Sequence, residues 1–446
     1  MTTEQPEISQ AVTAIFRAWQ QAGIDFLVLR NYDRLPHFTT NDIDVLLNRE
    51  QRRKAEAVLL DAARHAGFRL HNRAEFATLA LYLSHPVLQV QVHFDLFTDL
   101  KWRAFDFLDR RDFLNRKINR GLFAVPHPTD EAATNLLAYL IYSGNVKEKY
   151  KPSIAGGFQT EPEMARALLT RTYGPDLAAF VVDAGAREDW LRLESSAGAL
   201  RRALVFRQTT RRFWPTLSSL VANGGRVAWR FIQPPGLSVV LCGVDGCGKS
   251  TAASALFDRL SGTFSSQKGR HYHWKPPLFS TRRRATRGPV VQPHAAAVRG
   301  RAASLVFFAV HWFEFCLGSL LRIRPITFRG GLVVIDRFYY DFFVDQRRYR
   351  LNVPQGLVRA AYRLLPKPDL VFLLDAPPEV LRRRKQEVTP EETTRQREAY
   401  LHLVKGLPNG RIIDASQPAA KVAAALQIDV LDFLVARLEA RERKNE

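Results

Sequence analysis

The sequence predicts an α/β protein of several domains, in which a C-terminal domain with a parallel sheet follows an α+β domain and a helical spacer. Three observations lead to this prediction. Apolar strands and helices alternate over residues 236–440, which is the pattern of a parallel sheet. Several short strands with two helices fill residues 1–125, whereas residues 126–232 show helical periodicity alone. At 446 residues the chain is also too long for one ordinary hydrophobic core.

The composition is that of a globular protein with an excess of positive charge. Hydrophobic residues make up 46% of the chain, and its 65 Lys and Arg outnumber its 44 Asp and Glu, which gives a net charge of +21. The excess indicates an anionic partner such as a nucleotide, a nucleic acid or a membrane surface. Because it is spread along the chain, solvated basic faces explain it equally well. Nothing else supports a nucleic-acid partner, and none is expected.

Cysteine usage and the first residues favour a cytoplasmic location. Only three cysteines occur, without metal-ligand spacing or a disulfide framework, as in a reducing compartment. The N-terminus carries Glu4 and Glu7 and no long apolar run, unlike a secretory signal. An apolar segment at 303–321 has the length of a short membrane span, but His311 and Glu314 lie near its centre. We therefore expect a buried or half-buried helix there and no transmembrane segment; peripheral membrane contact stays open.

The N-terminal domain places acidic residues on two of its strands. The expected elements are helices at 10–23 and 50–67 and strands at 26–29, 41–47, 78–83 and 88–95. Asp42 and Asp44 are two residues apart on one strand, so both carboxylates face one side, roughly 6–7 Å apart at the backbone. On the last strand Gln91, His93 and Asp95 share one face. Three carboxylates on neighbouring strands are a ligand set for two Mg²⁺ ions.

With Asp42, Asp44 and Asp95 at these positions, the domain resembles the nucleotidyltransferase fold of the DNA polymerase beta superfamily. The resemblance implies that the three carboxylates bind metal. The chain departs from the superfamily pattern at Arg30 and Asn31, where a Gly-Ser turn that grips the triphosphate is expected. An active transferase, a degenerate or binding-only domain, and carboxylates on solvated strand ends all stay open. The helical spacer that follows carries no catalytic motif, and Gln-Pro-Pro-Gly at 233–236 is typical of a linker.

The C-terminal domain opens on a phosphate-binding loop. The sequence GVDGCGKS at 243–250 fits G-x-x-x-x-G-K-[ST], between an apolar strand at 237–242 and a helix at 252–260. The nucleotide-binding positions are Gly243, Val244, Asp245, Gly246, Cys247, Gly248, Lys249, Ser250 and Thr251. Loop N–H groups can point at phosphate oxygens, Lys249 can reach the β- and γ-phosphates, and the Ser250 hydroxyl can bind Mg²⁺. The loop thus predicts ATP and Mg²⁺ as cofactors.

Two later segments fit the same site. Asp336 and Arg337 end an apolar strand at the edge where ligands bind in open α/β sheets, so Asp336 can hold Mg²⁺ and Arg337 can hold an acceptor phosphate. A basic helix, with Arg383 and Arg384, follows the next strand and can close over the phosphates. Between loop and strand, an Arg-rich stretch at 281–301 shows no pattern of its own.

From GVDGCGKST, Asp336-Arg337-Phe338, LLDAPPEVLRRRK and IIDASQP, the segment 237–438 resembles the thymidylate kinase family of P-loop nucleoside monophosphate kinases. The resemblance implies an Asp-Arg pair for metal and acceptor phosphate and a lid that includes Arg383 and Arg384. It also implies a homodimer. The residues that would border the adenine are Ala415, Ser416 and Gln417.

The parts of that family that recognise the base are not evident. His-Trp-Lys-Pro at 273–276 replaces its Arg-Glu-Pro-Gly-Gly-Thr stretch, and the central apolar helix lacks the Arg and Gln that read the pyrimidine. Residues 336–350 resemble divergent thymidylate kinase-like proteins that are fused to nucleotidyltransferase-like domains. The acceptor is expected to be a nucleoside monophosphate. A sugar or sugar phosphate for surface polysaccharide, stacked on Trp274, Tyr339 and Tyr340, is the alternative, as is a nucleotide-binding regulator with little catalysis.

Overall fold

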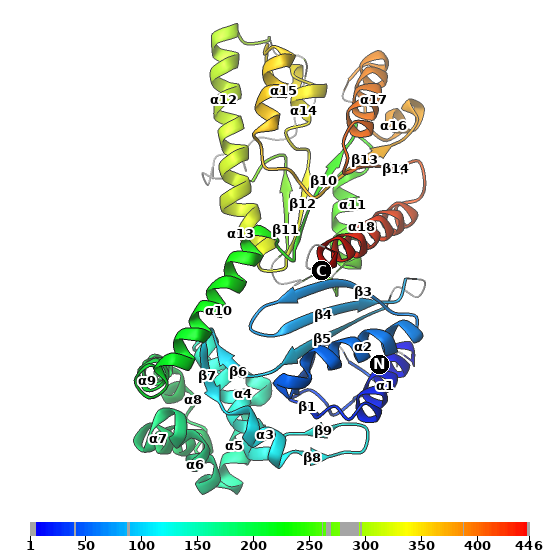
Figure 1. Cartoon of the computed structure of the whole chain (residues 1–446). Helices are drawn as coiled ribbons and strands as arrows, with labels where there is room; N and C mark the ends of the chain where they lie inside the picture. Colours follow the sequence, from blue (N-terminus) through cyan, green and yellow to red (C-terminus); the bar gives the residue numbers. More distant parts are fainter. Residues whose placement is uncertain are drawn as a thin grey trace. The chain divides into compact units, whose positions relative to one another are not determined.

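The computed structural model of the chain describes residues 6–39, 42–86, 90–260, 262–264, 269–276, 294, 297–386 and 388–443. The chain divides into two compact units, Met1–Trp229 and Arg230–Glu446, and each contains its own five-stranded sheet (Figure 1). Of the Arg-rich stretch at 281–301, residues 281–293, 295 and 296 lie outside the described part of the chain.

The first unit is built on a mixed sheet of order β1-β2-β5-β4-β3. Its strands are β1 (Phe26–Val28), β2 (Ile43–Leu47), β3 (Arg69–Glu75), β4 (Leu79–Ser84) and β5 (Gln91–Phe97). β2 and β5 run parallel, and the other neighbours are antiparallel. Helices α1 (Pro6–Gln21) and α2 (Arg52–His65) bury their apolar stripes against one face of this sheet. β5 alternates as the sequence predicts, with Val92, Phe94 and Leu96 buried and the polar residues between them half-buried.

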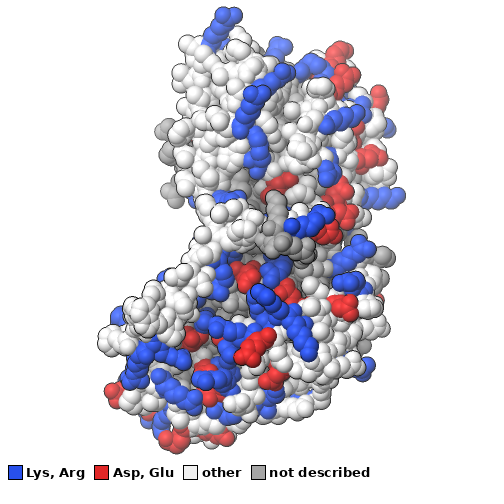
Figure 2. All heavy atoms as spheres, viewed as in Figure 1, with Lys and Arg blue, Asp and Glu red and all other residues white. Residues whose placement is uncertain are grey.

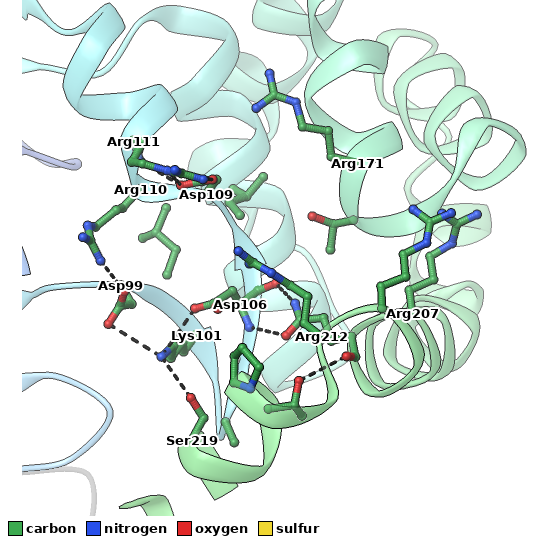
Figure 3. Close-up of a pocket in the computed structure, with 18 of the residues that line it drawn as sticks. Asp99, Lys101, Asp106, Asp109, Arg110, Arg111, Arg171, Arg207, Arg212 and Ser219 are labelled. Carbon is green, nitrogen blue, oxygen red and sulfur yellow. Dashed lines mark hydrogen bonds and ion pairs between the residues drawn. The ribbon is translucent and has the colours of Figure 1, made fainter.

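Beyond β5 the chain forms small hairpins and then a helical segment. Their elements are β6 (Leu100–Trp102), β7 (Phe105–Leu108), α3 (Arg110–Arg116), β8 (Ile118–Asn119), β9 (Ala124–Val125), α4 (Pro128–Tyr142), α5 (Lys151–Thr160), α6 (Pro162–Tyr173), α7 (Pro175–Ala186), α8 (Trp190–Ser195), α9 (Ala197–Arg211) and α10 (Phe213–Ile232). Proline starts α4, α6 and α7, where its missing N–H costs nothing. Helices α3 to α9 contribute to one hydrophobic core with Leu27 and Leu46 of the sheet side. They also border a cavity lined with basic side chains (Figure 3).

The second unit confirms the predicted α/β class with a parallel sheet. Its strand order is β11-β12-β10-β13-β14, and every pairing is parallel. The strands are β10 (Leu237–Cys242), β11 (Arg270–His273), β12 (Leu332–Asp336), β13 (Leu370–Asp375) and β14 (Gly410–Asp414). The central strand β10 is buried at every position, which explains its continuous apolar sequence.

Helices cover both faces of this sheet and extend beyond its carboxyl edge (Figure 1). They are α11 (Lys249–Arg259), α12 (Arg301–Gly318), α13 (Arg324–Phe328), α14 (Asp341–Val344), α15 (Gln355–Arg363), α16 (Pro378–Arg384), α17 (Pro390–Lys405) and α18 (Ala419–Glu442). Because the strands are parallel, their carboxyl ends bring His273, Asp336, Asp375 and Asp414 to the edge where the phosphate-binding loop begins.

The apolar helix at 301–328 is half-buried. Among the described residues, Arg301–Phe328 is the one helix long and apolar enough, by length and composition, to cross a membrane. One side packs Phe308, His311 and Phe315 into the core, and the other exposes large apolar residues. The exposed residues are Leu305, Val306, Val310, Phe313, Leu320 and Leu321.

The surface charge is spread over the chain. On the face shown in Figure 2, Lys and Arg lie over both units and are interspersed with Asp and Glu, while the surface over α12 carries few charges. This view matches the even distribution of basic residues along the sequence and shows no single basic stripe.

Candidate active site

The phosphate-binding loop connects β10 to α11 and depends on its glycines. Gly243 and Gly248 have φ of 142° and 91°, values that residues with a Cβ rarely adopt. A Cβ on Gly243 would lie 2.7 Å from Cys247 Sγ and 2.8 Å from the Leu374 carbonyl oxygen. The loop therefore packs directly against β13, and a side chain at this position would displace it.

Lys249 is buried at the start of α11 and turned back into the loop. Its Nζ donates hydrogen bonds to the carbonyl oxygens of Gly243 (3.0 Å) and Val244 (3.1 Å). Burial alone would lower the pKa of Lys249, but Cys247 and the carboxylates of Asp336 and Asp341 raise it above its usual value. The lysine is thus a permanent cation in the bend of the loop.

The structure brings Ser250 and Asp336 together. Ser250 Oγ donates to Asp336 Oδ2 at 3.2 Å, and His273 Nδ1 lies 3.3 Å from the same oxygen. Burial raises the pKa of Asp336, but the hydrogen bond from His273 and the charge of Lys249 outweigh it, so the net shift is downward. The other oxygen, Oδ1, is buried and has no hydrogen-bond partner among the described residues. An ionised carboxylate with a vacant oxygen beside a hydroxyl fits Mg²⁺, which prefers such hard ligands.

Arg337, directly after β12, connects the end of that strand to the phosphate-binding loop. Its backbone adopts φ of 65°, a left-handed conformation that costs energy for a residue with a Cβ. One end of its guanidinium pairs with Asp245 of the loop, and the other lies 3.6 Å from Asp341 Oδ2. Arg348 pairs with the second oxygen of Asp245. Two arginines therefore converge on one loop carboxylate.

Asp341 fixes the surroundings of this pair. It is buried, and its two oxygens accept hydrogen bonds from the hydroxyls of Tyr349 and Tyr400, each at 2.7 Å. Tyr400 belongs to α17, so one carboxylate ties α17 to the segment that follows Arg337. Sequence reasoning missed Asp341, together with His273 and Arg348. His273 is the last residue of β11, and Asp341 and Arg348 follow β12, so all three lie near the carboxyl edge of the sheet. No sequence motif includes them.

The basic helix α16 lies against the phosphate-binding loop. A Cβ on Gly246 would be 2.9 Å from the Leu381 carbonyl oxygen, so the helix packs closely there. Arg384 Nη1 donates to the Ala415 carbonyl oxygen at 2.8 Å, whereas Arg383 is exposed and reaches only the Glu379 carbonyl oxygen of its own helix, at 3.4 Å. Of the two predicted lid arginines, only Arg384 contacts another part of the site.

The segment predicted to border the adenine is a tight turn after β14. Asp414 Oδ1 accepts from the Ser416 N–H (2.9 Å) and hydroxyl (2.5 Å), and Gln417 Nε2 donates to Oδ2 at 3.1 Å. The Ala415 N–H donates to the Asp375 carbonyl oxygen at 2.6 Å, which joins this turn to the end of β13. Side chains thus fix the shape of the turn, and a backbone hydrogen bond holds it at the end of β13.

The aromatic residues proposed to stack on a sugar do not present a free face. Tyr339 and Tyr340 are fully buried and pack on Tyr362. Trp274 is 7% exposed and stacks on Tyr349, with ring centroids 4.8 Å apart. The prediction of a sugar platform is wrong for the two tyrosines, because they are part of the hydrophobic core.

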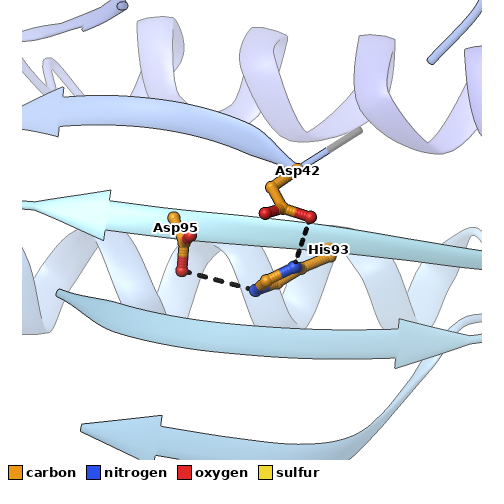
Figure 4. A group of neighbouring side chains, drawn as sticks. All are labelled: Asp42, His93 and Asp95. Carbon is orange, nitrogen blue, oxygen red and sulfur yellow. Dashed lines mark ion pairs between the residues drawn. The ribbon is translucent and has the colours of Figure 1, made fainter. Parts of the chain in front are cut away.

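In the N-terminal unit, the three predicted metal ligands come from the start of β2 and from β5, and each lies beside a basic side chain. Figure 4 shows Asp42 and Asp95 on either side of His93. His93 Nδ1 lies 2.9 Å from Asp42, and its Nε2 lies 3.3 Å from Asp95. Asp44, directly opposite Asp95, forms an ion pair of 2.5 Å with Arg30 Nε.

The two side chains that pair with these carboxylates, His93 and Arg30, favour the positively charged state. Burial opposes protonation of His93, but hydrogen bonds to Asp42 and Asp95 outweigh it and raise its pKa to about 9. The Asp44 carboxyl is buried, which raises its pKa, while Arg30 favours the ionised form. Arg30 comes from the position where the nucleotidyltransferase pattern expects Gly-Ser. While Asp44 is paired with Arg30, its carboxylate is not available to a metal ion. Metal binding by Asp42, Asp44 and Asp95 stays a prediction.

We expect the Arg30→Ala change to destabilise the N-terminal unit by about 3–5 kcal/mol, because it leaves the Asp44 carboxylate buried without its partner. Urea unfolding of the full chain, with hydrogen exchange of β2 and β5 to identify the unit, measures the loss. Arg17, exposed on α1, provides the control Arg17→Ala, which is expected to change little. The double change Arg30→Ala with Asp44→Asn should recover part of the loss; equal stability of the Arg30 variant and the parent would contradict the argument.

Comparison with known proteins assigns the C-terminal half. The family model described as thymidylate kinase matches residues 241–426. The thymidylate kinase of Xylella fastidiosa strain M23 is 30% identical over 230 residues, covering 47% of this chain and 93% of that protein. That of Xanthomonas campestris pv. campestris strain B100 is 28% identical over 218 residues, covering 46% and 88%. A solved thymidylate kinase from Ehrlichia chaffeensis is 18% identical, covers 43% of this chain and 97% of its own, and has a TM-score of 0.33.

The parallel sheet, the phosphate-binding loop and these similarities define a P-loop phosphotransferase. Through this C-terminal half, the chain belongs to the thymidylate kinase family. The resemblance of the N-terminal unit to nucleotidyltransferases stays a prediction.

Proposed function

We propose that the C-terminal unit transfers the γ-phosphoryl group of ATP to a phosphorylated acceptor, in the first instance a nucleoside monophosphate. The observation that carries this proposal is the Ser250–Asp336 pair, with its vacant buried carboxylate oxygen, beside the cation of Lys249. The similarity of this half to thymidylate kinases supports the proposal.

The donor side uses the loop and the first residue of α11. The N–H groups of the loop and Lys249 are proposed to hold the β- and γ-phosphates, since Lys249 needs only to leave two loop carbonyls to reach them. Ser250 and Asp336 are the residues that would hold Mg²⁺, which supplies charge neutralisation of the phosphates. His273 holds the Asp336 carboxylate in its ionised form.

The acceptor side is proposed to be Arg337, supported by Arg348. Both guanidiniums already converge on an anionic group, Asp245, in a geometry that suits a phosphate. Arg384 is proposed to position the lid and the turn at Ala415, Ser416 and Gln417, where the adenine would lie. Arg383, which is exposed, is free to move toward the transferred group when the lid changes position.

The acceptor proposal favours a nucleotide over a sugar. A sugar or sugar phosphate would lack the aromatic platform that Tyr339 and Tyr340 were expected to give, because both rings are buried. A cytoplasmic location suits an enzyme that uses ATP and has cysteines without disulfide bonds. A homodimer and peripheral membrane contact through α12 stay predictions.

An acceptor screen tests this proposal. ADP release from ATP and Mg²⁺ is measured with the natural nucleoside monophosphates, deoxynucleoside monophosphates, sugars and sugar 1-phosphates, and without acceptor. We expect at least one nucleoside monophosphate to raise the rate more than about tenfold, a barrier change of about 1.4 kcal/mol. Stimulation by sugar phosphates alone would overturn the acceptor class. No stimulation by any acceptor would leave nucleotide binding without transfer and overturn the proposed function.

A further inference from the structure

The N-terminal unit contains a cavity of about 550 Å³ that takes no part in the acidic cluster or the kinase site. The β6–β7 hairpin, α3, α6, α9 and the first turns of α10 form its walls. The size is that of a pocket for a small organic molecule. Figure 3 shows its labelled cations arriving from separate elements and surrounding the hollow.

The lining is strongly basic. Eight of the lining residues are cationic and three are acidic. The cations are Arg49, Lys101, Arg110, Arg111, Arg171, Arg207, Arg211 and Arg212, and the acids are Asp99, Asp106 and Asp109. The cavity therefore concentrates positive charge in a small volume, which focuses a positive potential inside it.

Part of this charge is compensated within the protein. Asp99 accepts from Arg49 at 2.9 Å and from Arg110 at 2.8 Å, and Lys101 Nζ is 3.7 Å away. Asp109 pairs with Arg111 at 2.7 Å. The third carboxylate, Asp106, lies 3.6 Å from Lys101 Nζ, and the charge of Arg212 favours the ionised forms of Asp106 and Asp109. Eight cations thus share three carboxylates.

Arg207, Arg211 and Arg212 are not paired in this way: none has an ion pair with a carboxylate among the residues that the structure describes. The three lie within six consecutive residues at the end of α9, so their charges repel one another. Arg171 is also on this wall, and the carboxylate that it contacts, Asp112 at 2.8 Å, is not part of the lining. An anion between these guanidiniums would relieve the repulsion.

The wall that carries these arginines is fixed by its own hydrogen bonds. The Gln208 side-chain amide bonds to both the N–H (3.0 Å) and the carbonyl oxygen of Asp106. The backbone carbonyl oxygen of Gln208 accepts a hydrogen bond from Thr216 Oγ1 at 3.1 Å. Lys101 Nζ reaches Ser219 Oγ at 3.4 Å. The hairpin, α9 and α10 are thus joined around the cavity, so the backbone segments that carry the cations are held together before any ligand binds.

We infer that this cavity binds a small molecule with two or more phosphate groups, held by Arg171, Arg207 and Arg212. One phosphate would satisfy only one or two guanidiniums in bidentate pairs, whereas adjoining phosphates can span the arginine wall. The cavity volume and its enclosure by several elements favour a small molecule over a polynucleotide. This site is separate from the proposed kinase activity and does not depend on it.

The test uses the full chain with Lys249→Ala, so that the phosphate-binding loop contributes as little as possible. Calorimetric titration with inorganic tripolyphosphate is compared between this protein and the same protein with Arg207→Gln and Arg212→Gln. Arg17→Gln, an exposed arginine on α1, is the matched control. We expect saturable binding that the double change weakens about tenfold or more and the control does not, and that weakens further as salt rises.

Hydrogen exchange locates the ligand independently of the variants. Tripolyphosphate should protect residues 99–111 and 207–219 of the Lys249→Ala protein, in which the phosphate-binding loop contributes as little as possible. Equal affinity of the double variant, protection elsewhere in the chain, or no saturable binding with Lys249→Ala would overturn the inference. So would binding of single-stranded RNA that tripolyphosphate does not displace. Thermal unfolding of each variant confirms that it is folded; if the double variant is not, the single Arg207→Gln and Arg212→Gln proteins are titrated instead.

Discussion

The Lys249→Ala protein is expected to lose phosphoryl transfer by about 10²–10³-fold or more in kcat, because one preorganised charge on the transferred group is removed. Lys249 is buried in the bend of the loop, where a cation acts through a low dielectric and water cannot replace it. The measurement is ADP release at saturating ATP with the best acceptor of the screen.

Lys421, exposed at the start of α18, gives the matched control Lys421→Ala, whose rate should stay near that of the parent. Circular dichroism and the thermal midpoint show whether the loop variant keeps its fold. A Lys249→Ala protein that is folded and retains more than about a tenth of the parent rate would contradict the assignment of this lysine to the donor phosphates.

The second large effect is expected from Asp336→Asn. The amide has nearly the same shape but no charge, so it keeps the packing at the end of β12 and loses the anionic metal ligand. We expect kcat to fall by about 10²–10³-fold and the Mg²⁺ concentration for half-maximal rate to rise. Steady-state rates over a series of Mg²⁺ concentrations measure both changes.

Asp258, exposed on α11, provides the control Asp258→Asn, for which neither change is expected. An Asp336→Asn protein with an unchanged dependence on Mg²⁺ would show that Asp336 does not hold the ion, even if its rate is low. Comparison with Lys249→Ala separates the two roles, since the lysine variant should lose rate without a comparable shift in Mg²⁺ dependence.

The parts of the site that the sequence predicts are those with a local cause. The loop at 243–250 needs only its glycines, its lysine and the strand and helix on either side, and all of these are contiguous. Asp336 and Arg337 were predictable because an apolar strand ending in a charged pair places that pair at the carboxyl edge of a parallel sheet.

The parts that escaped prediction depend on contacts between distant segments. His273 meets Asp336 because β11 pairs with β12, and nothing in the sequence around either residue shows that pairing. Asp341 became central because Tyr400, 59 residues later, reaches it from α17. Tyr339 and Tyr340 were expected to stack on a ligand, but they lie in the turn before α14 and pack on Tyr362, a contact that the local sequence does not show.

The N-terminal unit shows the same division. Alternation in β5 correctly predicted that His93 and Asp95 share a face, since the period of a strand is fixed by the backbone. That Arg30 would pair with Asp44 depends on β1 lying beside β2, which the sequence did not show.

The shared pairing of Asp245 with Arg337 and Arg348 has a consequence for how an acceptor would bind. In the proposed site, a phosphate that approaches Arg337 competes with a carboxylate that belongs to the protein. The affinity for the acceptor then depends on the difference between the arginine–phosphate and the arginine–Asp245 ion pairs. Acceptor binding in the proposed site would therefore be an exchange of anions with a small net free energy. The arginines are never left as bare charges between turnovers, and the product can leave as readily as the acceptor enters, with Asp245 as the returning counter-ion.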